Sequence, residues 1–317
     1  MKSFKYLYGP VPSRRLGRSL GIDLIPHKIC TYDCIYCQIG KTTLKTMTRR
    51  AYVPSEEILE EVKHFLKEEH LSIDYLSLSG SGEPTLHSQI GSIIEGIKAI
   101  TSIPVTVITN GSLLNLEEVR IDLLHADVIL PSLDAVSSEV FSKINRPVEG
   151  LSVEAVMEGL VQFRSIYKGR IWLEILFCKG VNNGEDELLR MKETIARIKP
   201  DWIHINTVVR PPSEKWVTPL SQEELEKIKG FLGDKTSIIS EFDRHHLHPA
   251  EGDIKQMILK ILRRRPLSFS DLSKGMGMRK DELDEYLVPL LQEGMIQSRR
   301  IGNSIYFEIL NRKDLSF

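Results

Sequence analysis

The sequence predicts an α/β fold, with an open or partial barrel of six strand–helix units followed by a small winged-helix domain. Over about residues 19–240 of 317, short apolar strands alternate with amphipathic helices, a pattern typical of parallel strands joined by helical crossovers. The strands are nearly continuous apolar runs, as expected when both faces of a sheet are covered. We expect these strands at residues 20–25, 75–79, 105–109, 128–133, 171–177 and 203–208.

The pattern changes near residues 242–252, a polar stretch that is typical of a linker. Beyond it, apolar residues at helical spacing predict one helix beginning near Ile254, a second over about residues 270–274 and a third containing residues 283–291. Residues 294–309 then predict a two-stranded wing with Gly302 and Asn303 at the turn. We therefore divide the chain into a barrel at 1–242, a linker at 243–252 and a winged-helix domain at 253–317.

Composition and charge exclude several classes of protein. The formal net charge is −1, so no overall field commits the chain to nucleic acid or to a membrane. No run approaches the roughly 18 apolar residues of a membrane span, and no apolar signal segment follows the first residues. Three of the four cysteines lie within eight residues, unlike the disulfide framework of a small secreted protein. We expect a cytoplasmic protein with no membrane segment.

Those three cysteines, Cys30, Cys34 and Cys37, have the spacing Cys-x3-Cys-x2-Cys. Three thiolates suit an iron–sulfur cluster, and a four-iron cluster with three protein ligands keeps one iron open for a substrate or cofactor. A zinc site with His27 as the fourth ligand is the structural alternative. Zinc sites usually pair two ligand groups across a longer loop, and the sequence has no second pair in range, so the spacing favours the cluster.

A glycine-rich turn, Leu78-Ser-Gly-Ser-Gly-Glu-Pro-Thr-Leu86, directly follows the second expected strand. Glycines at a strand end allow the backbone to approach a ligand closely, and Glu83 can accept a hydrogen bond from an ammonium group. Alone, such a turn is common in α/β proteins.

Together, the two motifs resemble the signatures of the radical S-adenosylmethionine (SAM) superfamily. Tyr36 supplies the aromatic residue of Cys-x3-Cys-x-aromatic-Cys, and Gly82 and Glu83 match the end of Gly-Gly-Glu, where Ser81 replaces the first glycine. The resemblance implies a partial (β/α)6 radical SAM barrel, a [4Fe-4S] cluster on the three cysteines, and S-adenosyl-L-methionine on the open iron. It places Gly82 and Glu83 at the amino group of SAM and Tyr36 near its adenine, although Tyr36 could equally be a packing aromatic.

The implied chemistry is that of a radical SAM enzyme of unassigned reaction. Reductive cleavage of SAM would give a 5′-deoxyadenosyl radical, which abstracts hydrogen from a substrate. The electron would come from a one-electron reductant such as flavodoxin or ferredoxin.

Polar residues also stand at the ends of later strands. Asn110 closes the third strand, Ser132 and Asp134 follow the fourth, and Glu174 belongs to the fifth. Ligands of parallel α/β folds gather at the carboxyl ends of strands, so these residues are candidates for binding SAM. Ser132, Asp134 and Glu174 would serve its ribose hydroxyls or its carboxylate. Asn110 and Asp134 could equally cap the helices that follow them.

Residues 8–21 and 38–41 are similar to the radical SAM subgroup often described as wyosine-tRNA-synthase-like, a resemblance that covers about residues 8–240. True wyosine synthases carry extra N-terminal cysteines for a second cluster. No cysteine precedes Cys30 here, so the pyruvate-joining tRNA reaction of those enzymes does not follow. Arg14, Arg15 and Arg18 could hold an anionic substrate or close the barrel through ion pairs.

Two C-terminal features have competing interpretations. His245, His246 and His248 could bind a transition metal, but on a polar linker a solvated role is favoured. Residues 251–317 hold 12 Lys and Arg against 10 Asp and Glu, and the third helix begins with four acids within residues 279–285. Such acids would repel phosphates in the usual major-groove pose, which argues against specific DNA binding. We expect a domain that presents a tRNA or peptide substrate; the alternative is a redox-sensing regulator that binds DNA.

Overall fold

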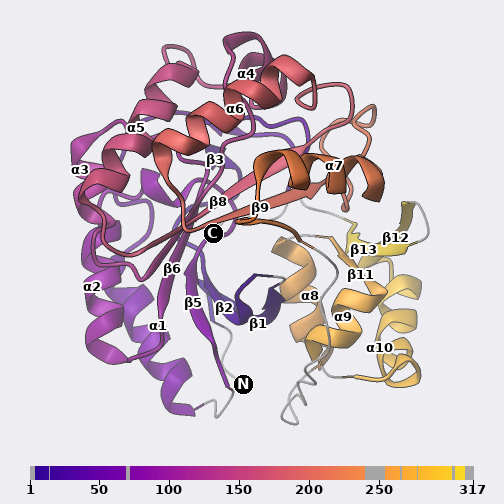
Figure 1. Ribbon diagram of the computed structural model, residues 1–317. Helices are drawn as coiled ribbons and strands as arrows, with labels where there is room; N and C mark the ends of the chain where they lie inside the picture. Colours follow the sequence, from indigo (N-terminus) through magenta and orange to yellow (C-terminus); the bar gives the residue numbers. More distant parts are fainter. Residues whose placement is uncertain are drawn as a thin grey trace.

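An eight-stranded sheet organises most of the computed structural model, which describes residues 4–13, 15–68, 72–239, 254–264, 266–276, 278–301 and 304–310 (Figure 1). The strand order is β1-β2-β5-β6-β7-β8-β9-β10, and every neighbouring pair is parallel except β1 and β2. The strands are β1 Leu7–Ser13, β2 Gly17–Ile22, β5 Tyr75–Leu78, β6 Val105–Thr109, β7 Val128–Pro131, β8 Arg170–Phe177, β9 Trp202–Thr207 and β10 Thr236–Ile238.

The predicted α/β class is confirmed, and all six expected strands are present with ends that differ by up to three residues. The mostly parallel sheet is that of a partial barrel. Two edge strands, β1 and β10, were not predicted. β1 contains Pro10 and Pro12, which weaken a strand pattern because proline donates no ladder hydrogen bond. Its place at the sheet edge explains why both prolines are tolerated.

The helices α1 to α7 connect the strands. Figure 1 shows α1, α2, α3 and α5 on the left of the sheet, α4 and α6 at the top and α7 on the right. On β8, Ile171, Leu173 and Ile175 are fully buried in the core that these helices share. The alternate residues Trp172 and Glu174 point to the other, half-buried inner face. The helices are α1 Ser55–Glu68, α2 Ile90–Ile100, α3 Glu117–Asp122, α4 Ser138–Ile144, α5 Val153–Ile166, α6 Glu185–Ile198 and α7 Gln222–Leu232.

The C-terminal residues form the predicted three helices and hairpin, with one additional short strand, β11. These elements are α8 Ile254–Arg264, β11 Leu267–Ser268, α9 Phe269–Met276, α10 Lys280–Gln292, β12 Ile296–Ile301 and β13 Ser304–Ile309. The strands form an antiparallel sheet in the order β11-β13-β12. The predicted linker at 243–252 and the turn residues Gly302 and Asn303 lie outside the described residues. The domain boundaries and the winged-helix assignment stay predictions.

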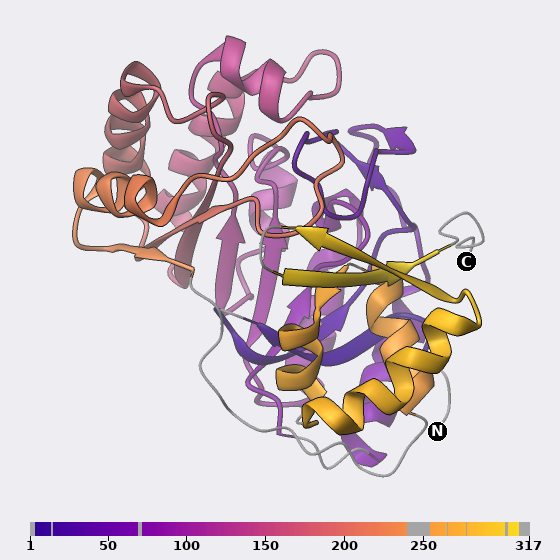
Figure 2. The same ribbon diagram turned by 90° about the vertical axis from the view of Figure 1, so that its right-hand side faces the viewer.

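This C-terminal unit, residues 254–310, packs against the N-terminal edge of the main sheet. Val11 of β1 is buried in the same apolar cluster as Ile258, Leu262 and Leu272. Figures 1 and 2 show the unit on the side of the sheet away from α1, α2 and α3. The hydroxyl of Tyr306 also donates to the carbonyl of Val209, just beyond β9. The unit therefore contacts both the β1 edge and the segment that follows β9.

Candidate active site

The three predicted cysteine ligands lie in the connection between β2 and α1, which we call the cysteine loop (residues 23–54). Within it, β3 Ile29–Cys30 pairs with β4 Leu44–Lys45, and the amide of Cys37 donates to the carbonyl of Cys34 at 3.1 Å. The amide of Ile35 donates to the carbonyl of Ile144 at 3.0 Å, at the carboxyl end of α4. Backbone contacts to distant parts of the chain therefore hold this loop in place.

A side-chain nitrogen donor lies beside each cysteine sulfur of the loop. The side-chain amide of Asn110 is 3.5 Å from the Cys30 sulfur, and that of Asn145 is 3.4 Å from the Cys34 sulfur. The ammonium of Lys28 is 3.1 Å from the Cys37 sulfur. Donors of this kind stabilise negative charge on sulfur, which is the form that binds iron. Sequence reasoning included Asn110 in the site but missed Lys28 and Asn145.

Without a bound metal, at least two of the thiols hold their protons firmly. Burial raises the pKa of Cys30 to about 11, and the nearby Glu83 carboxylate adds to the effect. Burial likewise raises the pKa of Cys34 well above its ordinary value, with Asp134 as a second cause. Metal binding at neutral pH must therefore displace these protons.

The residues of the loop fit a [4Fe-4S] cluster better than their count alone indicates. The ligands are three thiolates, the donors that such clusters prefer, and each sulfur has a hydrogen-bond donor of the kind that tunes cluster potentials. Over the described residues, no three His, Cys, Asp or Glu side chains gather as a site for one metal ion. A four-iron cluster differs from a single ion here, because each thiolate binds a different iron.

The glycine-rich turn packs directly against the cysteine loop. The amide of Glu83 donates to the carbonyl of Ile29 at 3.2 Å, one residue before Cys30. A side chain at Gly82 would place its Cβ 2.0 Å from the same carbonyl oxygen, so the close approach requires glycine at this position. The structure thus brings together the two motifs that are more than 40 residues apart in the sequence.

The Glu83 carboxylate is buried and held by four donors. Its Oε1 atom accepts from the amide and hydroxyl of Thr85 at 3.0 and 2.6 Å and from the hydroxyl of Thr109 at 2.6 Å. Its Oε2 atom accepts from the amide of Asn110 at 2.7 Å. Burial raises the pKa of Glu83, and these hydrogen bonds oppose that effect. Within the described residues Oε2 has this one donor, and a carboxylate oxygen can accept a second.

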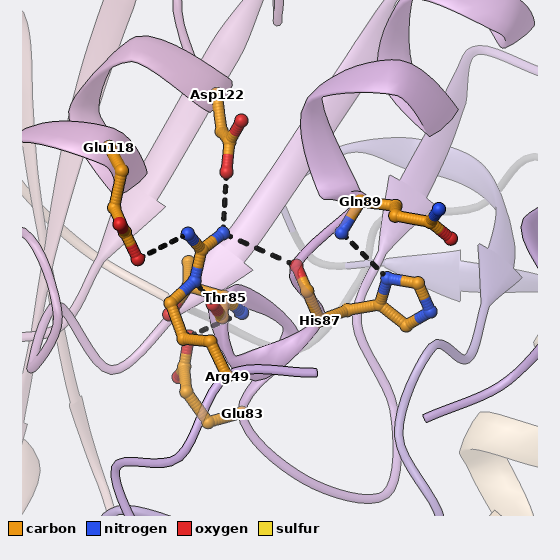
Figure 3. A network of polar contacts seen from close by, with 7 residues as sticks. All are labelled: Arg49, Glu83, Thr85, His87, Gln89, Glu118 and Asp122. Carbon is orange, nitrogen blue, oxygen red and sulfur yellow. Dashed lines mark hydrogen bonds and ion pairs between the residues drawn. The ribbon is translucent and has the colours of Figure 1, made fainter. Parts of the chain in front are cut away.

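A half-buried arginine fixes the short 3₁₀ helix η1 (Pro84–Leu86), which follows Glu83 (Figure 3). Arg49 donates to the carbonyl of Thr85 at 3.0 Å and to that of His87 at 3.4 Å. Its guanidinium also pairs with Glu118 at 2.8 Å and with Asp122, both on α3. Arg49, in the cysteine loop, thereby joins the Glu83 turn to the helical layer.

Asp134 is buried and accepts hydrogen bonds from three protein groups. Its carboxylate accepts from the hydroxyl of Tyr36, from the Asn145 amide at 3.0 Å and from the Leu176 amide at 2.9 Å. Burial raises the pKa of Asp134, and these hydrogen bonds, led by that of Tyr36, oppose the rise. The hydrogen bond from Tyr36 to Asp134 ties the residue next to Cys37 to the carboxyl end of the sheet.

The capping role considered for Asn110 and Asp134 is wrong. The N-cap positions of α3 and α4 are Leu116 and Ser137, several residues beyond the two candidates. Asn110 instead accepts from the amide of Ser112 at 3.0 Å and donates to Thr31 at 2.8 Å, so it joins β6 to the cysteine loop.

The remaining strand-end candidates lie near β7 and β8. Ser132, just after β7, forms an isolated bridge with Glu174 of β8, and Glu174 forms an ion pair with Arg15. Arg18 lies near Asp74, with 3.6 Å between the guanidinium Nε and the carboxylate. Of the two roles expected for these arginines, the described contacts show ion pairing across the sheet. Arg14 and the histidines at 245, 246 and 248 lie outside the described residues.

Sequence reasoning also missed a histidine on the inner face of the sheet. The ring of His204 on β9 lies 5.6 Å from that of Trp172 on β8. Burial lowers the pKa of His204 to about 4, and the charge of Arg15 adds to this effect. The imidazole is therefore neutral at physiological pH. Side chains alternate between the two faces along β9, and this places His204 on the inner face. No sequence motif marks it as a functional residue.

Comparison with known proteins identifies the family. The sequence model described as "Radical SAM superfamily" matches residues 24–191. A protein of Methanocaldococcus jannaschii named "UPF0026 protein MJ1312" is 32% identical over 97% of both chains. A protein of Brachyspira hyodysenteriae named "GTPase Obg" is 36% identical over 96% of this chain, which spans only 45% of that relative.

Solved structures show the same fold at low identity. SuiB of Streptococcus suis bound to S-adenosylmethionine superposes with a TM-score of 0.53 at 12% identity, over 71% of this chain and 51% of SuiB. SuiB bound to its precursor peptide SuiA gives a TM-score of 0.54 at 11% identity, over 71% of this chain and 49% of SuiB. None of the helices in the described ranges has the length and apolar character to cross a membrane. The chain belongs to the radical SAM superfamily, a family of enzymes that use a [4Fe-4S] cluster and S-adenosylmethionine.

Proposed function

We propose that this protein cleaves SAM reductively and uses the resulting 5′-deoxyadenosyl radical to abstract a hydrogen atom from its substrate. The observation that carries the proposal is the contact between the cysteine loop and the glycine-rich turn, where Glu83 donates to Ile29. When bound, the cluster supplies the one electron that converts SAM to methionine and the radical. The protein's part is to hold SAM in one orientation and to exclude water from the reacting carbon.

The residue roles follow from the site. Cys30, Cys34 and Cys37 bind the cluster. The carbonyl groups around Gly82 and the second acceptor position on Glu83 receive the methionine ammonium, since the carboxylate is fixed by its four donors.

The remaining candidate residues differ in how well the structure supports a contact with SAM. Tyr36 lies beside the adenine in our proposal, with its hydroxyl anchored on Asp134. Asp134 and Glu174 remain candidates for the ribose hydroxyls, but protein groups already occupy them. Ser132 is therefore the favoured polar contact of the ribose. Asn110, whose side chain also has protein partners, stays a candidate for the carboxylate.

For the substrate we favour a peptide that the C-terminal unit presents. The first turn of α10 carries Asp281, which is exposed, and Glu282, which is partly exposed, and both pair with the exposed Arg279. This first turn has more acidic than basic groups, so it would not attract the phosphates of a tRNA or of DNA. Arg210, just beyond β9, is 3.0 Å from Gln38 in the cysteine loop and 3.6 Å from Asp271 in the C-terminal unit. A substrate bound to that unit would thus lie next to the site. The scaffold remains, in our proposal, of the wyosine-tRNA-synthase-like subgroup.

Anaerobic reconstitution tests this function. The protein should bind about four irons per chain. After reduction in the presence of SAM it should form methionine and 5′-deoxyadenosine. Cys34→Ala should lose both properties, whereas Cys178→Ala, which changes a buried cysteine outside the loop, should keep them. A Cys34→Ala variant that still cleaved SAM would refute the proposal.

The same assay examines the substrate. A peptide substrate should increase the rate of 5′-deoxyadenosine formation in the full-length protein and should itself acquire or lose hydrogen. Stimulation by tRNA and not by peptides would transfer the proposal to RNA. Equal rates with both, and without either, would exclude a presented macromolecule.

A further inference from the structure

Lys28 is a buried lysine whose backbone is fixed on both sides. It lies two residues before Cys30 and is 3% exposed. Its amide donates to the carbonyl of Ser81 at 2.7 Å, and its carbonyl accepts from the amide of Thr43 at 2.9 Å. Its φ angle of 58° lies in the left-handed region, which favours glycine or asparagine over lysine. The fold therefore holds this side chain in one place.

The charge of Lys28 has no carboxylate partner. Within the part of the chain that the structure describes, no Asp or Glu lies within ion-pair distance of its ammonium. The polar atom that its ammonium contacts is the Cys37 sulfur, at 3.1 Å. A buried ammonium is costly unless a negative charge compensates it. Once the cysteine loop binds a metal, its sulfurs are thiolates, and that of Cys37 is in direct contact with the ammonium.

The three sulfurs are consequently not equivalent. Cys30 and Cys34 receive neutral amide N–H groups from Asn110 and Asn145, whereas Cys37 faces a full positive charge. Solvent screens a charge at this depth very little, so its effect on a bound cluster is large compared with that of a surface lysine.

We propose that Lys28 raises the reduction potential of the cluster by holding a positive charge against Cys37. Adding one electron makes the cluster and its thiolates more negative by one charge, and a nearby fixed cation stabilises that reduced state. The electron comes from an external one-electron donor protein, and no bond forms or breaks at Lys28. The inference rests on the proposed function in one respect, that the cysteine loop holds a cluster.

Three substitutions separate charge from hydrogen bonding. Lys28→Arg keeps both, Lys28→Gln keeps an N–H donor without the charge, and Lys28→Met keeps neither. All three side chains are unbranched at Cβ, so the backbone strain at φ 58° is the same in each. Lys41→Met is the matched control, because it removes a lysine four residues after Cys37 whose side chain is 71% exposed.

The readout is the midpoint potential of the reconstituted cluster without SAM, measured by a redox titration followed by electron paramagnetic resonance. Iron content and the optical spectrum establish that each variant is loaded. Lys28→Met and Lys28→Gln should favour the oxidised cluster at least tenfold more than the unchanged protein, a shift of about 59 mV to lower potential. In Lys28→Arg and Lys41→Met the ratio of oxidised to reduced cluster should stay within threefold of that in the unchanged protein.

Several outcomes would overturn the proposal. An unchanged potential in loaded Lys28→Met and Lys28→Gln would do so, as would a shift in Lys28→Met alone, which would show that a neutral hydrogen bond suffices. A loss of SAM affinity without a change in potential would make Lys28 a SAM ligand instead. Failure of the unchanged protein to assemble a cluster would instead contradict the proposed function, so the two failures are distinguishable.

Discussion

Ser81 stands where the family motif has the first of its two glycines, and its side chain has a definite partner. Its hydroxyl donates to the Asp23 carboxylate at 2.6 Å, and its amide lies 3.1 Å from the same group. Both residues are 2% exposed. Asp23 follows β2, whereas Ser81 follows β5, so this pair joins the starts of the cysteine loop and the glycine-rich turn.

Replacing Ser81 with glycine would restore the family motif and should nevertheless destabilise the protein. The substitution removes a hydrogen bond to a buried carboxylate and frees the backbone of the unfolded chain, at a cost of roughly 2–3 kcal/mol. Urea unfolding of the metal-free protein measures the difference. Ser81→Ala removes only the hydroxyl and should lower the free energy of unfolding slightly less than Ser81→Gly. Combined with Asp23→Asn, it completes a double-mutant cycle. If Ser81→Gly had the same free energy of unfolding as the unchanged protein, this role of the serine would be contradicted.

At this scale the sequence predicted the residues with a signature and missed those defined by distant contacts. Cys30 and Glu83 could be recognised because their spacing is fixed along the chain. Asn145 could not, because it meets Cys34 across 111 residues. Lys28 could not either, since nothing in its neighbourhood shows that its long side chain turns inward to Cys37.

Among the structural elements, η1 depends most clearly on a single side chain. Arg49 contacts the carbonyl of Thr85 within η1, that of His87 just after it and two acids of α3, as Figure 3 shows. A lysine could not make these contacts together, because only the guanidinium presents several donors in one plane. The orientation of the Glu83 turn against the helices is therefore set by one residue of the cysteine loop.

We predict that Arg49→Ala lowers the free energy of unfolding by roughly 3 kcal/mol, because it leaves carbonyl groups and the part-buried Asp122 without their donor. Arg49→Lys should recover less than half of this loss. Denaturant unfolding measures both. The control Arg197→Ala removes an ion pair to Glu158 in which both side chains are about half exposed, and it should change stability by about 0.5 kcal/mol or less. Equal effects of Arg49→Ala and Arg197→Ala would contradict the assigned role.

The sequence predicted the elements with strong periodicity and missed the marginal ones. α1 is one of the amphipathic helices expected between the strands, and its residues Ile58, Val62 and Phe65 are buried. β1 was missed because its two prolines and its bulge near Val11 break the strand pattern, and pairing with β2 supplies what the local sequence does not. β10 and β11, at three and two residues, are too short to produce a period.

In the whole molecule, the C-terminal unit spans two distant parts of the main sheet. Its apolar core includes Val11 of β1, while Tyr306 and Asp271 reach the segment after β9. The sequence predicted this unit but not its docking surface, because Val11 has no feature that marks it as part of another unit's core. The unit is thus an integral part of the protein next to the cysteine loop and not a tethered module.

This docking can be tested by placing a charge in the shared core. Val11→Asp would bury a carboxylate in the apolar cluster that Val11 shares with Ile258, Leu262 and Leu272, at a cost on the order of 3 kcal/mol. Hydrogen–deuterium exchange should then show a loss of protection in α8 and α9, while the central strands β6 and β7 keep theirs. Val288→Asp, which alters a valine of α10 that is 47% exposed, should leave both regions unchanged. If Val11→Asp left the protection of α8 and α9 intact, the β1 contact would not be what holds the C-terminal unit. If docking also positions the substrate, Val11→Asp should abolish stimulation by a peptide while SAM cleavage without it continues.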